Sequence, residues 1–182
     1  AGVDGDSASI AEIFALLSDL SDVPIDQGFA VTGSINQRGE IQPIGGANEK
    51  IEGFYNLCKA RNLTGAQGVI IPARNAGDLQ LAPEIVAACE EGKFHVHAVS
   101  SVADGIEILT GVAAGTRDED GDFPEDSIFG MVEARLDEFR DILMGKEPED
   151  FRPVIALPGA PEAAQPPEEP GLPGQPPRPR AE

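Results

Sequence analysis

The sequence predicts an α/β fold, in which short strands alternate with helices along one chain. Two observations support this class. Short apolar runs such as residues 69–71 have the length of buried strands, and the segments between them carry apolar residues at spacings of three and four, as amphipathic helices do. Hydrophobic residues make up 41% of the 182 residues, which suffices for a core, and with no Trp and one Tyr that core must be mainly aliphatic.

The boundaries of the elements follow from local signals. Gly45-Gly46 precedes one helix, Pro83 opens another that Gly92 ends, and Ser100 or Ser101 caps a helix that stops at Gly111. A turn at residues 36–39 separates two strands. The expected helices cover residues 7–19, 47–61, 83–91, 101–109 and 127–144, and the expected strands cover residues 29–35, 40–44, 69–71 and 94–99.

Composition divides the chain into three parts. Residues 1–111 form the expected core, and residues 112–145 hold an acidic loop and a C-terminal helix. Residues 146–182 contain eleven of the 16 prolines, which block helices and sheets, so we expect a disordered tail. The chain starts with Ala rather than Met, and we expect a fragment or a processed product.

The charge and the apolar runs argue against several partners. The formal net charge of −19 disfavours nucleic acid and anionic lipid, which need a basic surface. No apolar run reaches the roughly 18 residues of a membrane span, so we expect a cytoplasmic protein. Cys58 and Cys89, without a secretion signal, are expected to be free thiols. His95 and His97 share a strand face but lack acidic or Cys partners at metal spacing, so no metal site is expected.

The first segment that can carry chemistry is Asp4-Gly5-Asp6-Ser7-Ala8-Ser9, directly before the first expected helix. A serine at a helix N-terminus lies beside free backbone N–H groups, which can stabilise an oxyanion. Serine and aspartate are also common helix caps, so this motif alone does not distinguish catalysis from capping.

The second segment places Lys50 in the first turn of the helix after Gly45-Gly46. A cation there opposes the helix dipole, which favours the neutral amine that a general base requires. Taken alone, the residue could equally be an exposed surface lysine.

Together these segments resemble the peptidase domain of Lon proteases. The matching motifs occur in order: Gly-Asp-Ser-Ala-Ser, Val31-Thr32-Gly33, Pro43-Ile44-Gly45-Gly46 with Glu49-Lys50, and Ile70-Ile71-Pro72 with Asn75 and Asp78-Leu79. The resemblance covers residues 1 to about 111. Asp6 before the serine and Ala8-Ser9 after it are similar to the B-type branch, whereas the commonest bacterial pattern has Pro and Ala-Gly there.

The resemblance implies a mixed sheet packed by helices, like the second domain of ribosomal protein S5. It implies a serine endopeptidase with Ser7 as the nucleophile and Lys50 as the general base. Thr32 would bind Lys50, Asp4 could hold the lysine in an inactive pairing, Gly45 would shape the turn, and the amides of Ala8 and Ser7 would form part of the oxyanion hole.

The resemblance also implies partners outside this chain. Family members act on polypeptides, couple this domain to an upstream ATPase module and assemble as hexameric rings. ATP and Mg would bind only that module, so no cofactor is expected here. Strands that precede the serine in relatives are expected to be missing. The alternatives are a catalytically degenerate α/β domain that binds peptides or subunits, and a nucleotide-binding domain, which the absence of a phosphate loop disfavours.

Overall fold

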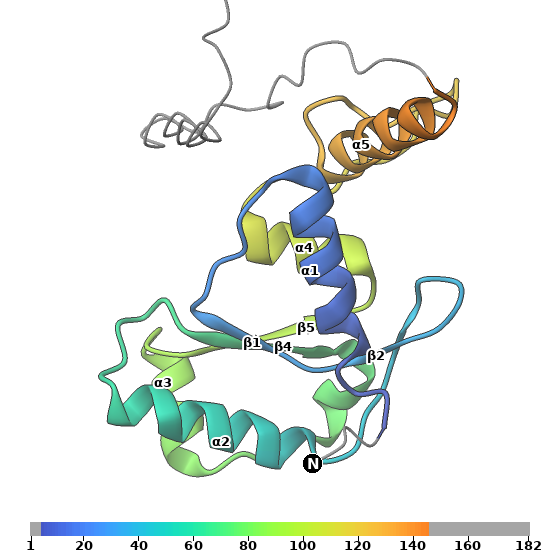
Figure 1. The fold of residues 1–182 in the computed structure, drawn as a ribbon. Coiled ribbons are helices and arrows are strands. Elements are labelled where there is room, and N and C mark those ends of the chain that lie inside the picture. The colour runs from blue at the N-terminus through green and yellow to red at the C-terminus, as the bar shows by residue number, and fades with distance from the viewer. Residues whose placement is uncertain (1–4, 146–182) are drawn as a thin grey trace, which may run out of the picture.

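A computed structural model describes residues 5–145 of the chain (Figure 1). Asp4 and the Pro-rich segment 146–182 lie outside the described residues, so the predictions made for them stay predictions.

A three-stranded parallel sheet lies at the centre, in the order β1 (Phe29–Val31), β4 (Gly68–Pro72) and β5 (His95–Val99). All five residues of the middle strand β4 are buried. A separate antiparallel pair joins β2 (Ser34–Ile35) to β3 (Ile41–Gln42). The predicted α/β class is confirmed, with parallel and antiparallel pairing divided between two sheets.

The strand predicted over residues 29–35 is interrupted, which is a correction to the sequence prediction. The parallel pairing with β4 ends at Val31, and the antiparallel pairing with β3 begins at Ser34. Between them, the Thr32 amide still donates to the Ile70 carbonyl at 3.0 Å, but the Gly33 amide donates to the Ser7 carbonyl at 2.9 Å. The break therefore turns the backbone from the sheet toward the serine segment.

Two hydrophobic clusters lie on opposite faces of the parallel sheet, because successive side chains of a strand point to opposite faces. Ile70 of β4 belongs to the cluster of α1 and α4, whereas Val69 and Ile71 belong to that of α2 and α3. Figure 1 shows α2 and α3 on one side of the sheet and α1 and α4 on the other. The helices are α1 (Ser9–Ser21), α2 (Ala47–Ala60), α3 (Pro83–Glu90), α4 (Val102–Thr110) and α5 (Ile128–Leu143), with a 3-10 helix η1 (Ala73–Asp78) after β4.

Several predicted helix ends are confirmed. Ser101 caps α4 in a reciprocal capping box with Asp104, and Gly111 ends this helix with a φ of 71°. Pro83 stands in the first turn of α3. Ser127 caps α5 by accepting from the Gly130 amide, and α5 packs on α1 with Ile128 and Met131 in the same buried cluster.

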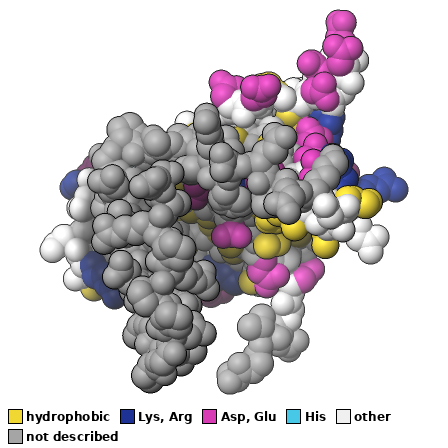
Figure 2. All heavy atoms as spheres, turned by 45° about the horizontal axis from the view of Figure 1, so that its top comes forward, with side chains coloured by type: hydrophobic (Ala, Val, Ile, Leu, Met, Phe, Trp, Pro, Cys, Tyr) yellow, Lys and Arg dark blue, Asp and Glu magenta, His cyan; other side chains and the backbone are white. Residues whose placement is uncertain are grey.

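The surface carries both acidic and exposed hydrophobic side chains, which lie side by side on the face shown in Figure 2. Across residues 5–145, every helix is too short or too polar to span a membrane. Cys58 and Cys89 are free, as predicted. In the expected acidic loop, the Asp118 carboxylate accepts from the amides of Asp120, Gly121 and Asp122.

Candidate active site

The segment that carries Ser7 is a turn before α1, tied to β2 by side chains on both sides of the serine. Ser34 is buried and donates from its hydroxyl to the Asp6 carboxylate at 2.5 Å. Ser9 accepts from the Ile35 amide at 3.0 Å and donates to the Asp6 carbonyl at 2.8 Å. The turn is thereby fixed against β2, while Ser7 itself is half-buried and keeps its hydroxyl accessible. The supporting roles of Asp6, Ser9 and Ser34 were not predicted, because the contacts with β2 join segments 26 and 28 residues apart in the sequence.

Lys50 lies in the first turn of α2, as predicted. The Gly46 backbone has a φ of 69°, in the left-handed region that favours glycine, and its carbonyl accepts from the Lys50 amide at 3.1 Å. The resemblance implied that Gly45 shapes this turn. In the structure Gly45 is exposed, has open space around it and does not adopt a positive φ, so the left-handed residue of the turn is Gly46.

The structure brings Ser7, Lys50 and Thr32 together. The Lys50 Nζ lies 2.9 Å from the Ser7 Oγ and 3.0 Å from the Thr32 Oγ1. Thr32 is buried, with 7% of its surface exposed, and its hydroxyl donates to the Ser7 carbonyl at 3.1 Å. Thr32 therefore contacts both the lysine side chain and the backbone of the serine.

The hydrogen bond of Thr32 limits how Lys50 can interact. A hydroxyl has one proton, and the Thr32 proton is directed to the Ser7 carbonyl. Thr32 can therefore only accept from Lys50, so the lysine must donate an N–H to it. A neutral Lys50 would have two N–H groups and one lone pair, and with one N–H on Thr32 the lone pair can face the Ser7 hydroxyl. This arrangement allows proton transfer from serine to lysine.

Two backbone amides beside the serine have no partner among the described residues. Within residues 5–145, the amides of Ser7 and Ala8 donate no hydrogen bond, whereas those of Ser9 and Ile10 donate to Asp6 and Gly33. Helix α1 also lacks a side-chain cap at its first turn. Free amides at a helix start beside a nucleophile are suited to an oxyanion hole.

Asn75 is a further residue near the site, which sequence analysis noted only as part of a motif. Its side-chain oxygen accepts from the Ile44 amide at 3.0 Å, and its side-chain nitrogen donates to the Ile44 carbonyl at 2.9 Å. Ile44 precedes the glycine turn that leads to Lys50. The side-chain amide of Asn75 thus supplies the two hydrogen bonds that the backbone of a neighbouring strand would otherwise make with Ile44.

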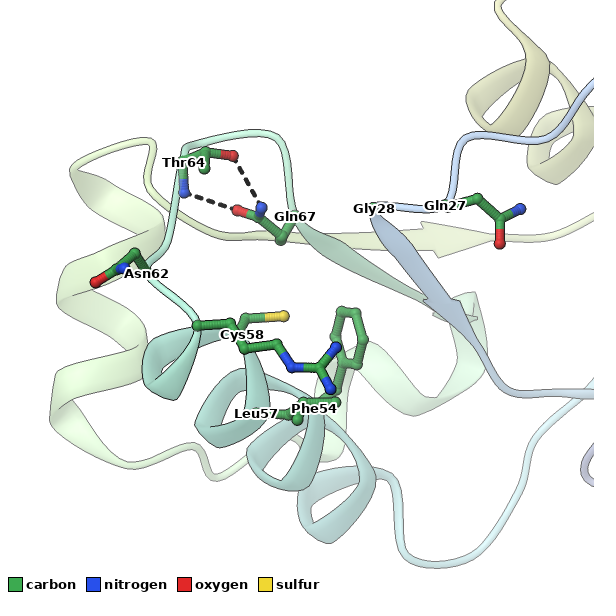
Figure 3. Close-up of a pocket in the computed structure, with 9 residues that line it drawn as sticks. Gln27, Gly28, Phe54, Leu57, Cys58, Asn62, Thr64 and Gln67 are labelled. Carbon is green, nitrogen blue, oxygen red and sulfur yellow. Dashed lines mark hydrogen bonds between the residues drawn. The ribbon is translucent and has the colours of Figure 1, made fainter.

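Other candidate sites lie away from Ser7. A shallow hollow of about 260 Å³ is lined by Cys58, Arg61 and Gln67 at the opposite end of α2 and contains neither Ser7 nor Lys50 (Figure 3). In the described part of the chain, no group of three or more His, Cys, Asp or Glu is placed to hold a metal. The His95 ring binds the Gly65 carbonyl at 2.8 Å, and burial together with His95 lowers the pKa of His97.

Comparison with known proteins gives a consistent result. A putative Lon protease homolog from Escherichia coli (strain K12) is 57% identical over 107 residues, which cover 59% of this chain and 18% of that protein. A putative Lon protease homolog from Haemophilus influenzae is 39% identical over 137 residues, or 74% of this chain and 22% of that protein. An archaeal Lon protease from Archaeoglobus fulgidus is 40% identical over 106 residues, or 58% of this chain and 15% of that protein.

The chain therefore spans less than a quarter of the length of these relatives. The family profile of the Lon protease (S16) C-terminal proteolytic domain matches residues 2–110, which include Ser7, Thr32, Lys50 and Asn75. The chain belongs to this family of proteolytic domains, whose enzyme class is the Lon-type serine endopeptidase.

Proposed function

We propose that this chain hydrolyses peptide bonds with Ser7 as the nucleophile and Lys50 as the general base. The observation that supports it best is the 2.9 Å separation between the Lys50 Nζ and the Ser7 Oγ, across 43 residues of sequence. Nucleophile and base within hydrogen-bond distance are the minimum that covalent catalysis requires, and Thr32 adds the third group that orients the base.

The reaction would follow from this geometry in two steps. Lys50 takes the proton of Ser7 while the Oγ forms a bond to the peptide carbonyl carbon, and the carbonyl oxygen becomes an oxyanion. The C–N bond then breaks, and Lys50 returns the proton to the leaving amine. Water attacks the resulting ester, with Lys50 again taking the proton, and the acid product leaves while Ser7 regains its hydrogen.

The free amides of Ser7 and Ala8 would stabilise the oxyanion in both steps. They lie where the backbone enters α1, so the helix dipole adds to the effect of the two N–H groups. Ala8 would act through its backbone amide alone, and its exposed methyl group would take no part in the reaction.

A comparison of Ser7→Ala and Lys50→Ala tests the proposal. Each variant is expected to lose peptide hydrolysis with an unchanged melting temperature, because the two groups act as a unit. A serine-directed reagent followed by mass spectrometry should modify Ser7 in the unmodified sequence and much more slowly in Lys50→Ala. Hydrolysis by Lys50→Ala at the original rate would exclude Lys50 as the base, whereas absence of both hydrolysis and Ser7 modification in the unmodified sequence would support the alternative of a degenerate domain that binds peptides or subunits.

The wider activity of the relatives extends the proposal. The family resemblance implies an upstream ATPase module, which would bind ATP and Mg, and a hexameric cytoplasmic assembly for the full protein, and the greater length of the relatives leaves room for such a module. For the chain alone, we expect slow cleavage of short or unfolded peptides that does not depend on ATP. Efficient degradation of a folded substrate by this chain would contradict that expectation. Addition of the segment that precedes the domain in relatives should increase peptide cleavage.

A further inference from the structure

Asn75 makes a two-point contact with the backbone ahead of the Lys50 helix. Its amide group accepts from the Ile44 N–H and donates to the Ile44 carbonyl, at 3.0 and 2.9 Å. Only a side chain with both a donor and an acceptor can satisfy both groups of one residue in this way. An aspartate of the same shape would keep the first contact and place a carboxylate against the Ile44 carbonyl.

The contact leads directly to Lys50. Two residues after Ile44, the left-handed Gly46 begins α2, and its carbonyl accepts from the Lys50 amide. A second contact joins the same helix start to the segment after η1, since the Asn48 side-chain oxygen accepts from the Gln80 amide at 2.9 Å. The start of α2 is therefore held on two sides by the chain that follows β4.

The strand β4 holds the serine half of the site as well. Its Ile70 carbonyl accepts from the Thr32 amide, and Thr32 in turn donates to the Ser7 carbonyl. Pro72 at the end of β4 lies close to Gly33, whose added Cβ would stand 3.5 Å from it. The buried strand thus contacts the Ser7 half at Ile70 and reaches the Lys50 half through Asn75, only three residues beyond Pro72.

We propose that Asn75 is a positioning residue for Lys50, which fixes the start of α2 so that the lysine Nζ stays within hydrogen-bond distance of Ser7. The proposal rests on the proposed Ser7–Lys50 mechanism. Displacement of a catalytic group by about 1 Å can cost roughly 100-fold in rate. Loss of the Asn75 contact should accordingly lower the reactivity of Ser7 about 10- to 100-fold, through Lys50 alone.

The test is a double-mutant cycle on the full chain with a fluorophosphonate as the serine-directed reagent. The rate of Ser7 modification is measured for Asn75→Asp with Lys50 present and again in the Lys50→Ala background. A positioning role lowers the rate about 10- to 100-fold when Lys50 is present and less than about twofold when it is absent. A merely structural role would lower both rates equally.

A matched control exists at the other end of β4. Gln67 also makes two contacts through its side-chain amide, accepting from the Thr64 amide at 2.9 Å and donating to the Thr64 hydroxyl at 2.8 Å (Figure 3). Gln67→Glu changes the same chemistry far from Ser7 and should leave the modification rate unchanged in both backgrounds.

The outcomes separate the two proposals. If Lys50→Ala alone leaves the rate of Ser7 modification unchanged, both proposals are overturned. A rate that depends on Lys50 but is unchanged by Asn75→Asp, or is lowered equally in both backgrounds, would overturn the role of Asn75 alone. If Asn75→Asp does not fold, Asn75→Ala removes the same two contacts without adding a carboxylate and should lower the rate about 10- to 100-fold with Lys50 present; an unchanged rate there would also overturn the proposal.

Discussion

The two halves of the proposed dyad are held by different means. Ser7 is supported by its own neighbours, since Asp6 and Ser9 bind β2 on either side of it. Lys50 has less local support: α2 has no side-chain cap and begins at a left-handed glycine, and the contacts that fix its start come from Asn75 and Gln80. The nucleophile is thus placed by a short segment, whereas the base depends on the chain that follows β4 across the sheet.

This difference predicts which side of the site tolerates amino-acid substitutions better. The Ser7 turn has several contacts that act together, so the loss of one leaves the others. The Lys50 helix starts from few contacts, and its side chain reaches the serine over the full length of a lysine. We therefore expect the lysine side of the site to respond more strongly to substitution.

The largest expected effect is that of Lys50→Arg. Guanidinium stays protonated and has no acceptor, so the general base is lost while the positive charge is kept. We expect peptide hydrolysis per folded molecule to fall about 10²- to 10⁴-fold. The matched control is Lys59→Arg at the other end of α2, where Lys59 pairs with Glu84 on the surface. Turnover of Lys50→Arg equal to that of Lys59→Arg would exclude Lys50 as the base.

Thr32→Val is expected to have the next largest effect. Valine keeps the volume but removes both the acceptor for Lys50 and the donor to the Ser7 carbonyl. We expect kcat for a reporter peptide to fall about 10- to 100-fold, because the lysine lone pair is no longer directed to Ser7. Thr32→Ser retains the hydroxyl and should keep most of the activity. If Val and Ser behave alike, the hydroxyl has no orienting role.

Substitution of one glycine on each side of the sheet compares the packing of α1, which follows Ser7, with that of α2, which carries Lys50. At Gly105 in α4, an added Cβ would stand 2.3 Å from the Phe14 ring of α1, whereas at Gly53 in α2 it meets open space. Gly105→Ala should lower the free energy of unfolding by about 1–3 kcal/mol through overpacking. Gly53→Ala should raise it by about 0.5–1 kcal/mol through helix propensity. Urea denaturation measures the free energy of unfolding of both variants. If Gly105→Ala is as stable as Gly53→Ala, the contact between α4 and the Phe14 ring of α1 is not tightly packed.

The last comparison concerns the cap of α4, a feature that α2 lacks. Partial burial raises the pKa of Asp104, but hydrogen bonds from the Ser100 and Ser101 amides and the Ser101 hydroxyl outweigh it, so the pKa is lowered on balance. The stabilisation is therefore complete above the pKa of the unfolded chain and is lost as pH falls through the folded value. Ser101→Ala should cost about 1 kcal/mol at neutral pH.

Asp104→Asn completes this last comparison. It should reduce the dependence of melting temperature on pH between about 5 and 2, the range in which aspartates take up protons. An unchanged acid dependence would mean that Asp104 contributes nothing to the cap.

Local sequence signals predicted much of the fold. Pro83, Ser101 and Gly111 act within one helical turn of their own positions, so the ends of α3 and α4 could be predicted from neighbouring residues alone. The break after Val31 could not, because residues 29–35 alternate as a continuous strand would. It depends on two partners far along the chain, Ile70 and Ser7.

The candidate site shows the same division. Ser7 and Lys50 could be predicted because their motifs occur in order along the chain, although each residue alone would fit a helix cap or a surface lysine equally well. The supports contributed by Ser34 and Asn75 could not, because a buried serine or an asparagine in a turn fits many structures equally well. Only the folded chain brings Asn75 to Ile44 across 31 residues.

The parallel register of β1 and β4 determines how the correctly folded fraction of a preparation can be measured. Val31 is paired with Ile70, and this pairing determines that the next side chain, Thr32, faces Lys50. A slip of one position would send Thr32 to the opposite face and bring a valine or a glycine in its place. Such a molecule could be compact and helical and yet inert, so the fraction of chains whose Ser7 reacts with a titrant counts correctly paired strands, which circular dichroism cannot do.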